Sequence, residues 1–493
     1  RDLDADVDFM IPNRVTDGYG MNISRVDKAI AKGAKLIITV DNGVACHEAI
    51  AYAKKRGLMV VLTDHHSFEL ESGLPNADAI VHPALGNYPY RDISGATVAY
   101  KLISHLFEQS TAVSNDRLDY YRTLAGITVI SDVMPLLNEN RTIYKKALSY
   151  LKEKKDANLT YLLDTLNVPI NTLNEIDFGF SICPLINAVG RIGDAEEGVR
   201  MFLSKTQEEI QNRVAMLCVL NEKRKELNKV QLEYAKTLVD DTESGIVVFD
   251  EKQHIHEGLI GIIAGRLCNE YKKPVVLFTK AKNKDGDAIW KASTRSVNGV
   301  DLYKVLQAME SVDASVFASY GGHSGAAGIS IPFDKKDEFT SLFYSEVSNH
   351  FEDQDVFYLD VKPENVEALL QAMEAYAPFG QGFPKPMIRT TFTLKCAKCY
   401  FGSGRSIWTN DFIEIWKDLD ETLEVMEKAD YKSTWSNYEK LLMEGNEDPT
   451  SNKTEYYRPN KTPATYELIS SITNTWFGGK KKPQLDVIKM ESI

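Results

Sequence analysis

The stretch KLIITVDNGVACHEAIAYAKKRGLMVVLTDHH, residues 35–66, decides the fold of the first part of the chain. Two apolar, β-branched runs, at 35–40 and 58–63, are typical of strands that are buried on both faces of a parallel sheet. The residues between them, about 45–56, have a helical pattern, and strand, helix and strand with short links form a βαβ unit with parallel strands. The carboxyl ends of both strands then lie at one edge of the sheet, where α/β folds bind their ligands.

Acidic residues and histidines stand at these strand ends. Asp41 follows the first strand, and Asp64, His65 and His66 follow the second. A third apolar run, ITVIS at 127–131, is interpreted as another strand and leads to Asp132. A single Asp at a strand end could simply cap the next helix. Three acidic strand ends with a histidine pair favour a metal site instead, and oxygen and imidazole ligands suit Mn²⁺ or Mg²⁺ better than a metal that prefers thiolates.

The second half of the chain repeats the α/β pattern after a long helix. The helix is expected to begin at Ser204, with Gln207 completing a capping box, and to reach about Asp240. We expect an α/β fold in five parts: a metal-binding catalytic domain at 1–203, a bridging helix at 204–241, a second α/β domain at 242–350, a small β domain at 351–405, and a C-terminal region of unknown role, helical in part, at 406–493.

Composition excludes several classes of protein. The 493 residues are too many for one core, and no run approaches the roughly 18 apolar residues of a membrane span. Four of the six cysteines are scattered, and Cys396 and Cys399 form a lone CxxC without a second pair nearby. They do not make a disulfide framework or a complete zinc site, which favours a reducing cytoplasm. The net charge of −13 argues against a broad basic surface that coats nucleic acid, although a narrow basic groove on an acidic body is compatible with it.

The order of the motifs resembles the DHH phosphoesterases, and within them the RecJ-like exonucleases that act on single-stranded DNA. The DHH-type segments are VDNG at 40–43, DHH at 64–66 and SDVMPL at 131–136. The more specific RecJ-like segments are IPNR at 11–14, GYG at 18–20, GATVA at 95–99, NAVGRIGD at 187–194, EGLIGIIAGR at 257–266, STRS at 293–296 and GGH at 321–323. PFGQG at 378–382 resembles the entry to an OB-like β domain. The resemblance covers roughly residues 1–395.

This resemblance implies a role for each matching residue. Asp41, His65 and Asp132 are expected to bind two divalent cations, Mn²⁺ or Mg²⁺. Asp64 is expected to orient the histidine pair, and His66 to meet the phosphate or the leaving oxygen. The expected phosphate and substrate contacts are Arg14, Tyr19, Arg191, Ser293, Arg295, Gly322 and His323.

The chain departs from the family pattern at its beginning. The family places a DxDxDG-type motif on a first strand, and a helix and a second strand separate it from the IPNR segment. Here Asp2-Leu3-Asp4-Ala5-Asp6 looks like that motif, yet IPNR follows almost at once. Either residues are missing between Asp6 and Phe9, or the acidic motif lies upstream. On the first interpretation, Asp4 and Asp6 are metal ligands.

The resemblance implies a cytoplasmic, metal-dependent 5′→3′ exonuclease that hydrolyses single-stranded DNA to 5′-mononucleotides in recombination, repair or replication. Its expected partners are the 5′ end of single-stranded DNA, together with single-strand-binding protein or other replication and repair proteins, and no membrane. Two alternatives stay open. One is a smaller-substrate DHH phosphodiesterase that acts on oligoribonucleotides or cyclic dinucleotides, and the other is a catalytically silent DHH scaffold of the replication machinery.

Overall fold

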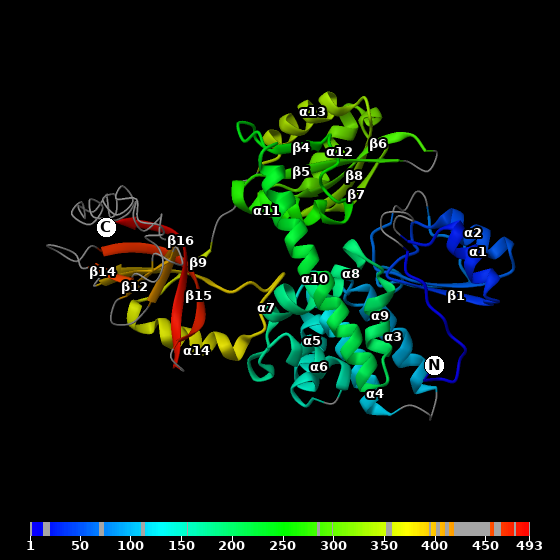
Figure 1. Cartoon of the computed structure of the whole chain (residues 1–493), viewed down its shortest axis with the longest axis horizontal. Helices are drawn as coiled ribbons and strands as arrows, with labels where there is room; N and C mark the ends of the chain where they lie inside the picture. The colour runs from blue at the N-terminus through cyan, green and yellow to red at the C-terminus, as the bar shows by residue number, and fades with distance from the viewer. Residues whose placement is uncertain are drawn as a thin grey trace. The chain divides into compact units, whose positions relative to one another are not determined.

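The computed structural model has an α/β fold (Figure 1). It describes residues 2–12, 20–68, 73–109, 114–154, 156–282, 286–297, 299–351, 357–393, 396–400, 405–409, 414–418, 454–457, 465–477 and 480–492. The chain forms two compact units, Arg1–Gln354 and Asp355–Ile493. None of the described helices is both long enough and apolar enough to cross a membrane.

The first sheet has three parallel strands, and it confirms the βαβ prediction. In spatial order they are β1 (Leu36–Val40), β2 (Met59–Thr63) and β3 (Ala79–Val81). Helices α1 (Ile23–Ala31) and α2 (His47–Lys55) pack against one face. Val60 and Leu62 are fully buried there, because alternate strand residues point to the same face.

The prediction that β1 is buried on both faces was wrong. Leu36, Ile38 and Val40 point away from α1 and α2, and their exposed fractions are 42%, 48% and 48%. Met59 of β2, on the same face, is 53% exposed. Helix α3 contacts both strands, and Thr63, further along this face of β2, is buried, so the face is covered only in part. The apolar composition of β1 therefore does not mean that the strand is buried on both faces.

A group of helices follows the first sheet. It comprises α3 (Gly95–Glu108), α4 (Asn115–Ser131), α5 (Asn138–Lys152), α6 (Ala157–Thr165), η1 (Ile170–Thr172), α7 (Glu175–Asp177), the π-helical η2 (Phe178–Ile182), α8 (Cys183–Ile192) and α9 (Glu196–Leu203). Their shared core includes the fully buried Tyr144, Phe178 and Leu162. The run at 127–131, which we interpreted as a strand, is the last part of α4. Burial of Ile127 and Val129 among neighbouring helices outweighs the strand preference of β-branched residues.

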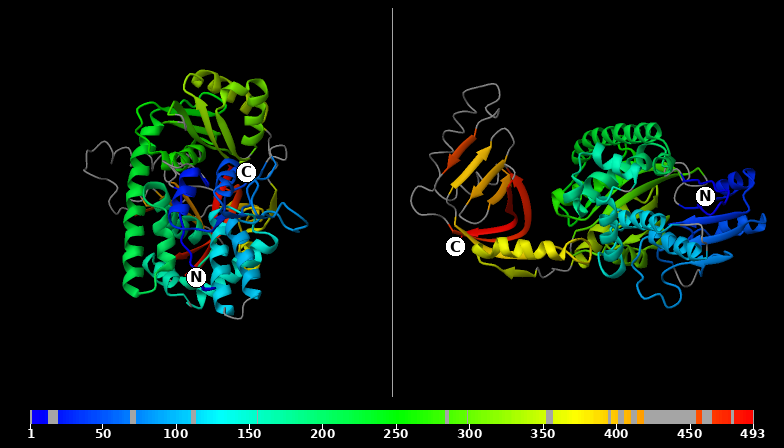
Figure 2. Two further views of the ribbon diagram at one scale, coloured as in Figure 1. Left: turned by 90° about the vertical axis from the view of Figure 1, so that its right-hand side faces the viewer. Right: turned by 90° about the horizontal axis from the view of Figure 1, so that it is seen from below.

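The long helix α10 (Gln207–Lys236) connects these helices to the second sheet of the same unit (Figures 1 and 2). It begins three residues later than we predicted. Thr206 is the N-cap and forms a capping box with Glu209, whereas the Ser204 hydroxyl donates to the carbonyl of Arg200 in the preceding helix, 3.0 Å away.

The second sheet has five strands in the order β4-β5-β6-β8-β7. They are β4 (Ile246–Asp250), β5 (Val275–Lys282), β6 (Ala288–Arg295), β7 (Ser319–His323) and β8 (Ala326–Pro332). The associated helices are η3 (Glu257–Leu259), α11 (Ile260–Tyr271), α12 (Leu302–Val312), η4 (Ala314–Val316) and α13 (Lys336–Asn349). Phe278, Phe339 and Phe343 are fully buried between the sheet and these helices.

The unit Asp355–Ile493 contains one mixed sheet in the order β14-β11-β12-β13-β16-β15-β10-β9. Its elements are β9 (Tyr358–Asp360), η5 (Pro363–Asn365), α14 (Val366–Tyr376), β10 (Met387–Thr393), β11 (Cys396–Tyr400), β12 (Arg405–Thr409), β13 (Glu414–Asp418), β14 (Thr454–Tyr457), β15 (Thr465–Phe477) and β16 (Lys480–Ser492). Strand β12 spans residue 405, where we expected a separate region to begin. The described residues after it form strands of the same sheet and no helix.

Candidate metal centre

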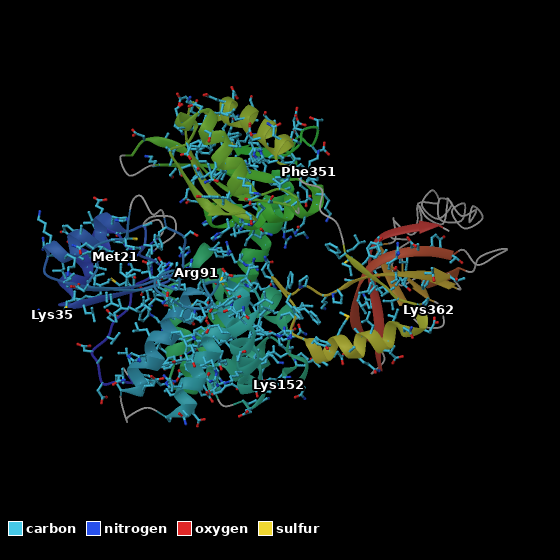
Figure 3. All side chains as sticks on the ribbon, turned by 180° about the vertical axis from the view of Figure 1, so that it is seen from behind. Met21, Lys35, Arg91, Lys152, Phe351 and Lys362 are labelled. Carbon is cyan, nitrogen blue, oxygen red and sulfur yellow. The ribbon has the colours of Figure 1, made fainter. Side chains whose placement is uncertain are left out.

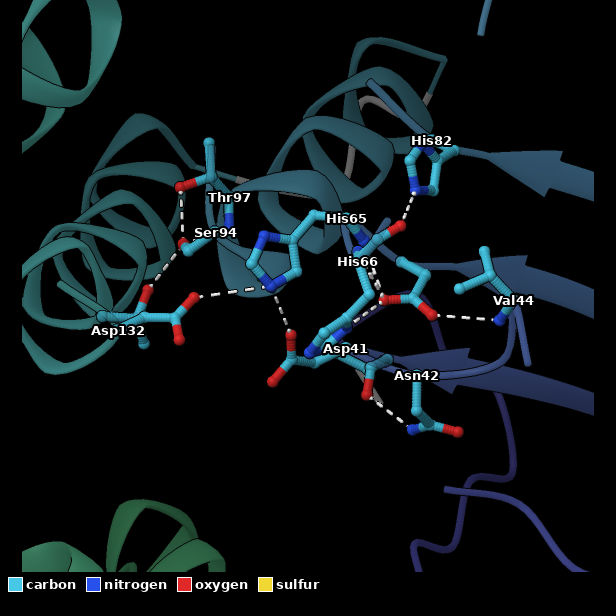
Figure 4. Close-up of polar contacts among 12 residues, drawn as sticks. Asp41, Asn42, Val44, His65, His66, His82, Ser94, Thr97 and Asp132 are labelled. Atoms are coloured by element: carbon cyan, nitrogen blue, oxygen red, sulfur yellow. Dashed lines mark hydrogen bonds and ion pairs between the residues drawn. The ribbon is translucent and has the colours of Figure 1, made fainter. Parts of the chain in front are cut away.

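Two carboxylates meet one imidazole where β1, β2 and α4 end. His65 Nε2 lies 3.1 Å from Asp41 Oδ1 and 3.4 Å from Asp132 Oδ2 (Figure 4). Ligand atoms of Asp41, His65 and His66 also lie within 4.8 Å of one another. We call Asp41, His65 and Asp132 the carboxylate–histidine cluster. The convergence of Asp41 and His65 is the one that the βαβ geometry predicts.

The donor atoms of this cluster fit a divalent cation. His65 Nε2 is buried and has no hydrogen-bond partner among the described residues, although two carboxylates face it. A buried nitrogen that makes no hydrogen bond costs free energy unless another partner satisfies it. Oxygen and imidazole ligands in this arrangement are typical of Mn²⁺ and Mg²⁺ sites.

Asp41 is held in an unusual backbone conformation next to a helix N-terminus. Its φ is +63°, in the left-handed region that Asp tolerates better than most residues. Its carboxylate lies against Gly95, the first residue of α3, where a Cβ atom would be only 2.2 Å from Asp41 Oδ1. Glycine at position 95 therefore makes room for the carboxylate, and the amino end of a helix favours a negative charge there.

Asp64 fixes the conformation of the histidine pair. Its buried carboxylate accepts hydrogen bonds from the backbone nitrogens of Val44, His65 and His66 at 3.0, 2.8 and 3.2 Å. It also accepts a 2.7 Å bond from His66 Nδ1, so His66 Nε2 is the ring nitrogen left for other partners. Burial alone would raise the pKa of Asp64, but these bonds outweigh it and lower the pKa to about 2. The Asp64 carboxylate in turn raises the pKa of His66.

His82 supports the same loop from β3. His82 Nδ1 accepts a 3.1 Å hydrogen bond from the backbone nitrogen of Ala84, so Nε2 carries the proton and donates to the carbonyl oxygen of His66 at 2.9 Å. Burial lowers the pKa of His82, which keeps the ring neutral and the tautomer unchanged near neutral pH.

Asp132 is the C-cap of α4, followed by a strained residue. The nitrogens of Val133 and Met134 donate to the carbonyls of Ile130 and Val129, which forms a Schellman motif. Val133 occupies the left-handed position of this motif, with φ +53°, where glycine is usual. Burial and the nearby charge of Asp41 raise the pKa of Asp132, while His65, His66 and His323 act in the opposite direction. Negative charge is therefore concentrated at the cluster, as a cation site requires.

We expect Asp64→Asn to lower the free energy of unfolding of the metal-free protein by about 2 kcal/mol at pH 7. The folded-state pKa of Asp64 is depressed, so its contribution is complete above the ordinary pKa near 3.8 and is lost as the pH falls towards 2. The difference in urea unfolding between wild type and variant should therefore shrink between pH 4 and pH 2. Glu108→Gln, which breaks an exposed pair with His105, is the control and should have little effect. A constant difference down to pH 2 would contradict the assigned role.

Two of the predicted phosphate contacts lie on β6 and face α11. Arg295 Nη1 donates to Ser293 Oγ at 3.0 Å and to the carbonyl of Thr294 at 2.6 Å. A Cβ atom at Gly261 would be 3.0 Å from Ser293 Oγ and 3.1 Å from Arg295 Nη2. Gly261 of the EGLIGIIAGR segment therefore leaves room for both polar groups against the helix.

The remaining predicted contacts are distributed over both α/β parts of the first unit. Arg191, at the end of α8, donates to the carbonyl of Gly258 at 3.2 Å and so connects the helical part to the second sheet. His323, at the end of β7, is near enough to influence the pKa of Asp132. Gly322 packs against β8, where a Cβ atom would be 2.4 Å from the carbonyl oxygen of Ala326.

The acidic residues near the N-terminus do not join the cluster. Asp2 forms an ion pair with Arg117 and accepts a 2.8 Å bond from Tyr121 in α4. The eleven helical residues from Tyr121 to Asp132 span about 16 Å, which sets Asp2 well away from the cluster. Asp4 and Asp6 are exposed, and neither belongs to the group of ligand atoms found among the described residues. Arg14 and Tyr19 lie outside the described residues.

Sequence reasoning missed the residues that support the cluster. Gly95 was noticed only as part of GATVA, and His82 was not singled out at all. A glycine at the first position of a helix, shortly after two strand ends rich in Asp, is the one signal that could have indicated a close approach. Nothing in the segment around His82 distinguishes it from an ordinary buried histidine.

Comparisons with known proteins identify two family domains in this chain. The DHH family, N-terminal domain, matches residues 1–128, and the DHHA1 domain matches residues 243–349. The single-stranded-DNA-specific exonuclease RecJ of Haemophilus influenzae is 30% identical over 412 residues, which cover 79% of this chain and 70% of that protein.

Two solved structures are also similar. The structure of RecJ in complex with Mn²⁺ from Thermus thermophilus has a TM-score of 0.74 and 22% identity, and the match covers 95% of this chain but only 63% of that chain. A second structure, of an exonuclease RecJ bound to manganese, has a TM-score of 0.55 and 28% identity over 69% of this chain and 82% of that one. The identity and coverage of the Haemophilus relative, together with both domain matches, show that this chain belongs to the RecJ family of DHH proteins.

Proposed function

We propose that the chain is a metal-dependent exonuclease that degrades single-stranded DNA from the 5′ end and releases 5′-mononucleotides. The observation that carries the proposal is the carboxylate–histidine cluster, in which His65 Nε2 is buried without a hydrogen-bond partner between two carboxylates. The membership of the RecJ family supports the substrate, since relatives about 30% identical are named as exonucleases specific for single-stranded DNA.

The residues that would hold a divalent cation are Asp41, His65 and Asp132. Solved relatives bound to Mn²⁺ or Mg²⁺ support this choice of metal. Two such ions, when bound, supply a water of lowered pKa and neutralise negative charge on the phosphodiester. The structure does not bring Asp4 and Asp6 to the cluster, and their role as further metal ligands stays a prediction from the sequence.

His66 is our proposed proton donor. Asp64 holds its Nδ1 and favours the imidazolium form, which leaves a protonated Nε2 on a side chain that is half exposed. Hydrolysis breaks the bond between phosphorus and the 3′ oxygen of the terminal nucleotide. Water adds to phosphorus, and the departing 3′ oxygen takes the proton from His66. The released nucleotide keeps its 5′ phosphate and gains a 3′ hydroxyl.

The 5′ end would be held by Arg295 and Ser293, with Arg191, Gly322 and His323 contributing further contacts. Arg14 and Tyr19 are assigned to the same end by resemblance. Arg295 already donates to Ser293, so its guanidinium is oriented on β6 before a ligand arrives. Arginine suits this task because its planar donors grip phosphate oxygens in pairs.

Arg295→Ala should reduce the preference for 5′-phosphorylated over 5′-hydroxyl single strands. Loss of one charge-assisted contact of about 1.5–3 kcal/mol corresponds to roughly a tenfold to hundredfold fall in kcat/KM on the phosphorylated strand. The measurement is kcat/KM on matched strands with and without the phosphate. Arg266→Ala removes the same charge from an exposed position of α11 and serves as the control. An equal fall on both strands would show that Arg295 does not read the terminal phosphate.

The proposed polarity can be tested with single strands that carry a label at either end, incubated with Mn²⁺ or with a chelator. A 5′ label should appear at once as mononucleotide, a 3′ label should appear in a shrinking strand, and a circular strand should stay intact. Release from the 3′ end or cleavage of the circle would refute the proposal. A marked preference for di- to tetranucleotides would indicate the small-substrate phosphodiesterase, and binding without degradation would indicate the scaffold.

The remaining assignments belong to the same proposal. We propose residues 1–203 as the catalytic domain and 242–350 as the substrate-binding domain, which the matches at 1–128 and 243–349 support. The OB-like fold of the small β domain at 351–405 stays a prediction. Binding to single-strand-binding protein or to other repair proteins also stays a prediction. A cytoplasmic location is supported by Cys46, Cys183, Cys218 and Cys268, which form no disulfide.

A further inference from the structure

An aromatic side chain projects from the helix that leads to Arg191. Phe178 and Phe180 stand two residues apart in the π-helical turn η2, but Phe178 is 1% exposed and Phe180 is 82% exposed. Single π turns inside α-helices are frequent at functional sites. Phe180 contributes little to the core, so its presence is not explained by packing.

Phe180 lies on the solvent side of η2 and α8, together with Asn187. Both side chains are exposed, whereas Phe178, Ile182 and Leu185 are buried on the core side of the same helices. Asn187 Nδ2 lies 3.4 Å from the hydroxyl of Ser131, the residue before Asp132. Along the common axis of η2 and α8, Phe180 lies about 10 Å from Asn187, and Arg191 lies in the opposite direction from Asn187.

A second contact places Gly179, the residue before Phe180, next to the end of α4. A Cβ atom at Gly179 would be 4.0 Å from Ile130 Cγ2, in the last turn before Asp132. Val133, directly after Asp132, is 65% exposed, and Ile176, four residues before Phe180, is 48% exposed. Exposed apolar side chains therefore occur both directly after Asp132 and in the turn before Phe180.

We propose that Phe180 is a stacking platform for a base of the DNA strand on the 3′ side of the scissile bond. The inference rests on the proposed function. If Arg191 and Arg295 hold the 5′ end and Asp132 marks the scissile phosphate, the strand continues along the helix towards Phe180. Every base has a π-face, so an aromatic ring binds it with little regard to sequence. A base in a duplex offers no such free face, and Phe180 thus favours single strands.

The test compares Phe180→Ala and Phe180→Tyr on strands of different length. On strands of ten or more nucleotides, Phe180→Ala should raise KM by about fivefold to a hundredfold, the range expected for loss of one stacked base. The tyrosine variant should retain wild-type KM. A dinucleotide is too short to reach the ring, so kcat/KM on it should be unchanged in both variants.

Strands with one abasic position provide the second arm. For the wild type, we expect KM to be higher when one particular position near the 5′ end lacks its base. For Phe180→Ala, KM should be the same with and without that base, because the ring and the base act as a pair. Phe351→Ala, which removes another exposed aromatic ring of the same unit, is the matched control and should behave as wild type (Figure 3).

Failure of this inference differs from failure of the proposed function. If Phe180→Ala and wild type share the same KM on long strands and the same response to abasic positions, the stacking role is wrong and the exonuclease assignment stands. An equal loss on the dinucleotide would also overturn it, since that indicates a disturbed cluster. If the wild type leaves single strands undegraded in Mn²⁺, the proposed function itself fails.

Discussion

Asp132→Ala is expected to lower the rate of single-strand hydrolysis in Mn²⁺ by at least roughly 10³-fold. Asp132 lies 3.4 Å from His65 Nε2 and supplies one of the two carboxylates of the cluster. Loss of a ligand weakens the binding of the metal ion. A bound ion stabilises the transition state by several kcal/mol, and each tenfold change in rate corresponds to about 1.4 kcal/mol of activation free energy. The rate is measured as mononucleotide release at saturating metal.

The fold should survive this change. Asp132 is a helix C-cap whose pKa is raised by partial burial and by the nearby charge of Asp41, so its ionised carboxylate is unfavourable when no cation is present. The melting temperature of the metal-free variant should therefore equal or exceed that of the wild type. Asp116→Ala, at the other end of the same helix, is the control and should retain activity. Near-normal hydrolysis by Asp132→Ala would remove Asp132 from the catalytic centre.

Gly95→Ala should reduce activity by roughly 100-fold although residue 95 bears no functional group. The added methyl would lie 2.2 Å from Asp41 Oδ1 and 2.6 Å from Asp41 Cβ, closer than real atoms approach. The Asp41 carboxylate must move, and displacements of about 1 Å at a catalytic centre can cost 10²-fold in rate. The apparent affinity for Mn²⁺, measured by titration calorimetry, should fall in parallel.

A second glycine separates this local effect from the general effect of alanine in a helix. At Gly198 in α9, the added Cβ would make only ordinary contacts, at 3.5 Å from Val189 Cγ2. Gly198→Ala should keep full activity and gain up to about 1 kcal/mol of stability from helix propensity. If both alanine variants retain wild-type affinity for Mn²⁺, the close approach of Gly95 to Asp41 has no functional consequence.

The part of the fold that positions the site could be predicted because the signals were local and consistent. The runs at 35–40 and 58–63, joined by a helix, fix two parallel strands whose ends coincide. Asp41 and His65 therefore meet without any knowledge of the rest of the chain, and their atoms are 3.1 Å apart. The same argument holds for β4 and β5, which are parallel as the repeated pattern indicates.

Predictions failed where tertiary surroundings decide the outcome. The run at 127–131 has the composition of a strand, yet it ends α4, because neighbouring helices bury it from several directions. Burial on both faces of β1 was expected from the same kind of composition, and one face is exposed. A local pattern reports which residues are apolar, but it does not report what packs against them.

The supporting residues could not be predicted for a similar reason. His82 and Gly95 reach the site through β3 and α3, and their roles depend on contacts of a few ångströms with the backbone of His66 and the side chain of Asp41. Phe180 lies in the π turn η2, a feature for which the sequence offers no periodic signal. The order of motifs predicted the family, whereas the geometry of these contacts required the structure.

The position of Mn²⁺ in crystals of this protein, measured by anomalous scattering at the manganese edge, tests whether Asp41, His65 and Asp132 bind the metal. We expect one of the Mn²⁺ peaks to lie about 2 Å from a carboxylate oxygen of Asp41, from His65 Nε2 and from a carboxylate oxygen of Asp132. We also expect this peak to be absent from crystals of Asp132→Ala grown and soaked in the same way. Full nuclease activity in Mn²⁺ from a protein whose peak lies elsewhere, with these three side chains unligated, would contradict the assignment.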